Sequence, residues 1–191
     1  MENYIKQNKL AVFLVLSAIL TGTAIGAFSQ IRLEETDASS LIFAVKNNIE
    51  NTKIFTAFLT SLKNEFLRFF VIAFCGSTML GTPVCVACLG MIGYSLGFSS
   101  CFLMQRFGLL GFLGVLLGII PHYSILLPAY SFLGISSINL SNEMLFGRKK
   151  VKNSFNNYLK KIILFAVIIF FAILVESFIS CLFLKKILMI K

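Results

Sequence analysis

The chain has 191 residues, of which 58% are hydrophobic and 13% are charged, and its formal net charge is +9. A typical soluble domain has about 25% charged residues, so this composition excludes a soluble globular protein. The apolar runs are long and do not alternate, which excludes a transmembrane β-barrel and predicts an all-α, polytopic helical membrane protein made of one domain.

The positive charge is concentrated beside one membrane segment rather than spread over a nucleic-acid-binding face. Six basic residues lie there: Arg148, Lys149, Lys150, Lys152, Lys160 and Lys161. Basic residues next to a span orient membrane helices and contact anionic lipid. We therefore expect membrane lipid as a partner and no nucleic acid.

The first predicted span covers residues 10–28, which carry no charge. The stretch is longer than the roughly 7–15 residues of a signal-peptide core, so we interpret it as an uncleaved helix. Gly22-x-x-x-Gly26 gives this helix a small face on which a neighbouring helix can pack. The alternative is that these glycines only reflect the general frequency of glycine in membrane helices.

Residues 30–68 are predicted to lie outside the membrane. Apolar residues recur there at helical spacing from Ile54 to Phe66, with polar residues on the other faces. This pattern is typical of an amphipathic helix that lies on the membrane surface and leads into the second span. The alternative is that the segment from Leu41 to Arg68 is a docking surface for a partner protein.

Residues 69–130 form the predicted core, and their only charged side chain is Arg106. A single helix of this length would be roughly 93 Å long, whereas the hydrocarbon core of a bilayer is about 30 Å thick. The core must therefore cross the membrane more than once. Breaks at Gly81-Thr82-Pro83 and near Gly108 divide it into predicted spans at residues 69–80, 83–104 and 109–133.

Glycine and proline residues predict how these core helices pack. Gly93-x-x-x-Gly97 presents a groove for a neighbouring helix, and Gly111 and Gly114 line one side of the span 109–133. Pro121 and Pro128 remove two backbone donors from that span, so we expect a kink or a break there. A broken helix persists at membrane depth only where protein or water satisfies its carbonyl groups, so the region near Pro121 should face the bundle interior.

A basic loop at residues 135–161 is predicted to be cytoplasmic, and the last span covers residues 162–184. The complete prediction is about five transmembrane helices plus an interfacial amphipathic helix. The basic loop places the N-terminus inside and the C-terminus outside, although the basic residues on the two sides nearly balance in number.

Two titratable side chains, His122 and Glu176, lie well inside predicted spans, where ionisable groups often mark function. For His122 the favoured interpretation is a hydrogen bond that satisfies the broken helix, and the alternative is a proton relay or ligand role. For Glu176 the favoured interpretation is a protonated or helix-bonded carboxyl group, and the alternative is a role in transport.

The sequence contains no recognisable reaction centre. One histidine cannot be matched by spacing to a nucleophile and an orienting carboxylate, and no glycine-rich phosphate loop is present. Cys85-x-x-Cys88 has the spacing of a zinc or redox pair, but a second pair is missing, so we interpret these residues as small packing side chains. We therefore predict no enzyme, no metal and no cofactor.

Short motifs of glycine, proline and polar residues follow one another through the predicted core in a characteristic order. They are Lys63-Asn64, Gly81-x-Pro83, Gly93-Tyr94, Gly97-Phe98, Gly108-x-x-Gly111, Pro121-His122 and Pro128. This succession resembles the stage II sporulation protein M family of small polytopic membrane proteins, in detail over residues 63–130. The family often has Gly or Asn after its Pro-His pair, whereas Tyr123 occupies that position here.

The resemblance implies a non-enzymatic scaffold in endospore formation. Sporulation members of the family sit in the mother-cell membrane at the septum and recruit stage II sporulation proteins D and P, which degrade septal peptidoglycan so that the forespore can be engulfed. Under this hypothesis Gly22/Gly26, Gly93/Gly97 and Asn64 belong to packing or partner-binding faces, and a homo-oligomer is also allowed. The alternative is a small transporter or channel subunit that uses the broken helix with His122 and Glu176.

Overall fold

The computed structural model describes residues 8–32, 40, 54–78, 81–145 and 156–174. All regular structure within these residues is helical, which confirms the predicted all-α class. Three helical segments are long and apolar enough to span a membrane: Lys9–Ile31, Gly81–Leu145 and Asn156–Leu174. The protein is therefore a helical membrane protein, and its apolar side chains cover the outside of the bundle as well as the inside.

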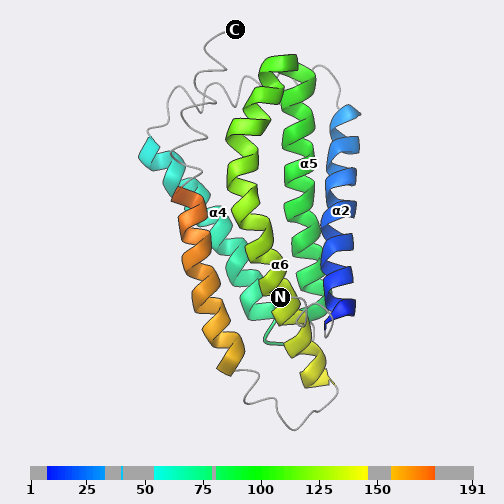
Figure 1. The fold of residues 1–191 in the computed structure, drawn as a ribbon, viewed down its shortest axis with the longest axis vertical. Coiled ribbons are helices and arrows are strands. Elements are labelled where there is room, and N and C mark those ends of the chain that lie inside the picture. Colours follow the sequence, from blue (N-terminus) through cyan, green and yellow to red (C-terminus); the bar gives the residue numbers. More distant parts are fainter. Residues whose placement is uncertain (1–7, 33–39, 41–53, 79–80, 146–155, 175–191) are drawn as a thin grey trace.

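The centre of the bundle is a helical hairpin (Figure 1). Helix α5 (Gly81–Gly114) bends at Gly108, continues through a π-helical turn, η1 (Val115–Ile119), and runs into α6 (Ile120–Leu145). Gly108 has φ 55° and ψ −126°, a backbone conformation that essentially only glycine adopts. The chain therefore reverses its direction at Gly108, as predicted, and it can do so because glycine has no side chain.

Helix α2 (Lys9–Ile31) lies beside the first arm of this hairpin and runs in the same direction (Figure 1). Helix α4 (Ile54–Cys75) crosses the bundle obliquely on the other side. The helix Asn156–Leu174, drawn in orange, lies beside α4. Five helical segments thus surround one core.

The structure has no boundary at residue 68, where the predicted extramembrane segment 30–68 meets the predicted span 69–80. Helix α4 is continuous from Ile54 to Cys75, and α2 already extends to Ile31. The described part of the predicted surface helix is therefore the first half of a helix that belongs to the bundle. Glu65 lies in this half, and its charge is compensated by partners inside the bundle. Residues 41–53 of that prediction lie outside the described residues.

Helix α6 corrects the prediction of a loop at residues 135–161. It continues to Leu145, and the last helix already begins at Asn156. Serines make this stretch look polar in sequence, but the Ser136 hydroxyl group donates to the Phe132 carbonyl oxygen of its own helix, at 2.9 Å. Such a bond satisfies a serine within a buried helix.

Of the kink or break predicted at Pro121 and Pro128, a break does not occur. Helix α6 passes through both prolines without interruption, and the π-helical turn η1 ends one residue before Ile120-Pro121. A proline ring collides with the carbonyl group four residues earlier, and a π-helical turn widens the helix where that room is needed. The π-helical turn thus provides the room that the ring of Pro121 needs.

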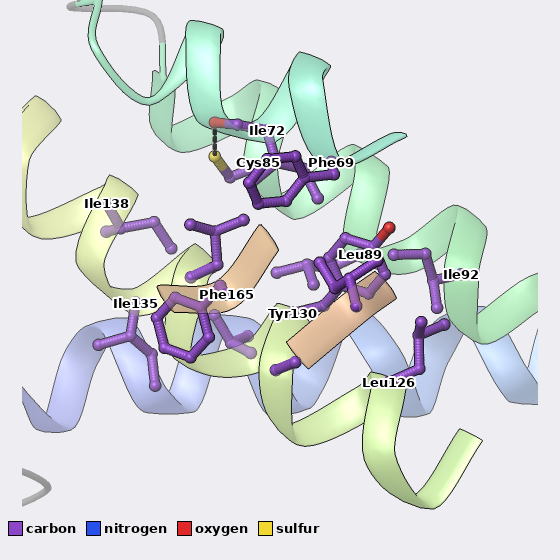
Figure 2. Packing of buried hydrophobic residues seen from close by; sticks show 14 of the residues in the cluster. Phe69, Ile72, Cys85, Leu89, Ile92, Leu126, Tyr130, Ile135, Ile138 and Phe165 are labelled. Atoms are coloured by element: carbon purple, nitrogen blue, oxygen red, sulfur yellow. Dashed lines mark hydrogen bonds between the residues drawn. The ribbon is translucent and has the colours of Figure 1, made fainter. Parts of the chain in front are cut away.

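The core is a continuous apolar cluster to which every helix contributes (Figure 2). Its labelled members are Phe69 and Ile72 from α4, Cys85, Leu89 and Ile92 from α5, Leu126, Tyr130, Ile135 and Ile138 from α6, and Phe165 from the last helix. Most of these side chains are fully buried. Any polar group in this region must therefore find its partner within the protein.

Candidate functional site

Four of the predicted packing glycines lie in the contact between α2 and α5. A side-chain carbon at Gly22 would overlap the backbone of Gly90, and one at Gly26 would overlap that of Tyr94. Two glycines of α5 meet α2 in the same way: Gly93 faces Ile19 and Gly97 faces Thr23. The two helices therefore approach to a distance that only glycine permits.

This glycine contact changes the interpretation of these residues. Their predicted role in helix packing agrees with the geometry, but each glycine face is filled by the other helix of the same chain. These faces are thus not open to a partner helix. Of the other two predicted packing glycines, Gly111 lies against the Leu103 backbone at the tip of the hairpin, and Gly114 is buried.

The most buried charged group described is Glu65, whose side chain is 8% exposed. The Tyr130 hydroxyl group on α6 lies 2.9 Å from the Glu65 carboxylate oxygen Oε2 and 2.9 Å from its backbone carbonyl oxygen. The Arg68 guanidinium group donates to the other carboxylate oxygen, Oε1, at 2.8 Å. Both carboxylate oxygens are thus bonded, and the group ties α4 to α6.

This Glu65–Arg68–Tyr130 site lies well away from both ends of the helical arm that follows Gly108. Tyr130 is about 33 Å along the helix from Gly108 and about 22 Å from Leu145, at about 1.5 Å per residue. A carboxylate buried among apolar side chains is costly unless it is paired. Glu65 was predicted to lie outside the membrane, so this site was not expected from the sequence. The Glu-x-x-Arg spacing and the position of Glu65 on the apolar row of the helix were signals of it.

A second polar group joins four helices at the end of the bundle where α4 ends and α5 begins. The Cys85 sulfur atom of α5 lies 2.8 Å from the Ser137 hydroxyl oxygen of α6. The Tyr158 hydroxyl group donates to the Ala73 carbonyl oxygen of α4 at 3.0 Å. Gly76 lies so close to Ser137 and Tyr158 that a side chain there would overlap both. Cys85 is therefore a buried packing residue, as the sequence predicted, with a hydrogen-bonded partner.

The single histidine links α6 to the last helix. His122 is buried, and its Nδ1 atom lies 3.2 Å from the Ala172 carbonyl oxygen. A carbonyl oxygen only accepts, so Nδ1 carries the proton in this contact. His122 thus bonds to a neighbouring helix. Glu176 lies outside the described residues.

The same pair of helices makes two further contacts in antiparallel register. The rings of Phe132 and Phe165 stack with their centroids 6.5 Å apart. Farther along, the Lys161 ammonium group donates to the Ser136 hydroxyl oxygen at 3.3 Å. With the His122–Ala172 bond, these contacts fix α6 against the last helix along its described length.

Asn64 directly precedes Glu65 in α4 and is exposed, whereas Glu65 is buried; Lys63 lies next to it. Both side chains are exposed, and in the part of the chain that the structure describes no hydrogen bond or ion pair joins either of them. Of the predicted partner-binding residues, Asn64 is thus the one that the fold leaves accessible.

The chain was compared with protein families, curated proteins and solved structures. A family model described as "Stage II sporulation protein M" matches residues 11–181. No curated protein and no solved structure matches the chain.

Proposed function

The chain belongs to the stage II sporulation protein M family and is a sporulation-related membrane protein; we propose that it acts as a non-enzymatic scaffold in endospore formation. In this proposal the protein lies in the mother-cell septal membrane. It recruits and anchors the peptidoglycan-degrading stage II sporulation proteins D and P, so that the septal wall thins and the membrane engulfs the forespore.

The observation that carries the proposal is that the main buried polar contacts join different helices of the chain. Tyr130 bonds to Glu65, Cys85 lies against Ser137, and His122 bonds to Ala172. Together with the α2–α5 glycine contact, these bonds hold the helices in fixed positions. A fixed helical frame with an apolar outside supports a role in holding other membrane proteins in place.

The alternative of a small transporter or channel subunit depended on a broken helix near Pro121. Helix α6 is continuous there, and His122 is bonded to the last helix. The unbroken helix and the bonded histidine do not favour that alternative, and Glu176, its other residue, lies outside the described residues.

The experiment is to delete the gene and measure the thickness of the septal peptidoglycan by electron cryotomography of sporulating cells. The proposal predicts a septum that stays thick and a forespore that is not engulfed, with recovery when the full-length chain is restored. Normal thinning in the deletion strain would contradict the proposal.

A further inference from the structure

The last turn of α2 is attached to α5 differently from the rest of the helix, which lies beside α5 along its length (Figure 1). In the two preceding turns, Gly22 and Gly26 bring the two backbones so close together that no side chain fits between them. Gln30 follows four residues after Gly26, so it lies on the same face of α2, and it is 1% exposed. It is the last buried residue of α2. Its side chain therefore occupies the end of the α2–α5 contact.

The amide group of Gln30 is buried without a hydrogen-bond partner. Within the residues that the structure describes, neither its Oε1 atom nor its Nε2 atom is hydrogen-bonded. A glutamine amide has one acceptor oxygen and two N–H donors. Burying such a group unbonded lowers stability, because the group has lost its hydrogen bonds with water and gained none within the protein. Gln30 thus weakens the contact that it occupies.

The other side chains of this turn interact within α2 itself. Phe28 and Ile31 are 56% and 60% exposed. The Ser29 hydroxyl group donates to the Ile25 carbonyl oxygen of the same helix at 2.8 Å. The Arg32 guanidinium group, directly after the helix, lies over the Phe28 ring, 4.6 Å from its centre. Gln30 is therefore the buried side chain that this turn contributes to the contact with α5.

Water is close to this end of α2. Arg32 is exposed, and a charged side chain exposed beside apolar helices lies in water or among lipid head groups. Gln30 is only two residues away, which is about 3 Å along the helix. When the last turn moves away from α5, its amide group can form the hydrogen bonds that it lacks in the closed position. Opening is thus less costly with Gln30 than with an apolar residue of the same size.

We propose that the last turn of α2, residues 27–31, is a movable end that opens by unwinding away from α5, while the glycine contact holds the rest of α2 in place. In the closed position the Gln30 amide group is buried and unbonded, and in the open position it is bonded to water. This inference goes beyond the proposed function, because it concerns a motion of the chain and requires no partner protein.

The test is amide hydrogen exchange of the full-length chain in mild detergent, measured by mass spectrometry for residues 27–31 and for residues 15–26. In the wild type, residues 27–31 should exchange faster than residues 15–26. Gln30→Met replaces the amide group by an apolar side chain of similar length. It should slow the exchange of residues 27–31 by about 5- to 150-fold, the range expected for a buried group without its hydrogen bonds.

A matched control separates burial from the effect of methionine. Gln105→Met makes the same substitution at an exposed position of α5, so the exchange of residues 27–31 should not change. Thermal unfolding shows whether the variants fold, and the midpoint of Gln30→Met should lie above that of the wild type. An equal slowing in Gln105→Met would overturn the proposal, because burial of the amide group would then not be the cause.

Three further results would overturn the proposal. Unchanged or faster exchange in Gln30→Met would mean that the amide group is bonded in the closed position, for example to a buried water molecule. An unchanged or lower unfolding midpoint of Gln30→Met would have the same meaning. Equal exchange of residues 15–26 and 27–31 in the wild type would mean that α2 moves as one piece and has no movable end.

Discussion

The Tyr130 hydroxyl group lies 2.9 Å from both the backbone carbonyl oxygen and the carboxylate oxygen Oε2 of Glu65. It joins α6 to α4 at the one carboxylate that the described core contains. Since Arg68 holds the other carboxylate oxygen, Tyr130 completes the bonding of a group that would otherwise be unpaired among apolar side chains. The position of α4 in the bundle depends on this contact.

Replacing Tyr130 by Phe should therefore destabilise the fold by about 1–3 kcal/mol, because a buried acceptor is left without its donor. The measurement is thermal unfolding of the full-length protein in mild detergent. Tyr94→Phe is the matched control, since Tyr94 is 39% exposed. An equal effect of the two substitutions would show that the Glu65–Tyr130 contact does not hold α4.

The α2–α5 contact predicts different results for two glycines of α5 that lie about two turns apart. Gly97→Ala should destabilise the protein by about 1–3 kcal/mol, because its new side chain would overlap the Thr23 backbone. Gly90→Ala should be neutral or stabilising, because its side chain would meet only the Ala18 carbonyl oxygen at 3.7 Å, an ordinary contact. Unfolding midpoints of both variants check this, and similar midpoints would contradict the packing described.

At Gly108 the effect of a substitution on stability should depend on the backbone conformation alone and not on packing. A side chain at Gly108 would meet nothing within 4 Å, yet the φ of 55° is strained for any other residue. Gly108→Ala should therefore cost about 1–3 kcal/mol. Gly118→Ala is the control, because it also has open space but no positive φ. If both variants unfold at the same temperature, the chain does not turn at Gly108 as described.

His122→Leu, which has no donor, should loosen the last helix without unfolding the bundle. The substitution removes the bond from Nδ1 to the Ala172 carbonyl oxygen, so amide hydrogen exchange should accelerate within Asn156–Leu174. Ser124→Ala is the control, because its hydroxyl group bonds only to the Pro121 carbonyl oxygen of the same helix, at 2.8 Å. Unchanged exchange in His122→Leu would mean that this bond is not what holds the helix.

The helical class, the turn at Gly108 and the packing role of Gly22, Gly26, Gly93 and Gly97 were predictable from local chemistry. Hydrocarbon thickness limits the length of a span, and close approach of two backbones requires residues without side chains. Both properties are visible in a single stretch of sequence. The partners of these glycines were not predictable, because two glycine faces in one chain can serve an external helix or each other.

The buried position of Glu65 was not predictable, because its compensating group, Tyr130, is distant in sequence. A carboxylate beside Lys63 and Arg68 looks like part of a solvated segment until that partner is known. The π-helical turn before Pro121 was not predictable either, because a sequence pattern does not show how the backbone relieves strain. Proline predicts strain, but the sequence does not reveal whether a break or a wide turn absorbs it.

Reconstituting the full-length chain with stage II sporulation proteins D and P in vesicles tests the scaffold account most directly. After detergent extraction, the tagged wild-type chain and Gly90→Ala should both retain the two proteins, whereas Gly97→Leu should lose them because its helical frame is disrupted. Failure of the folded wild-type chain to retain either protein would contradict the account.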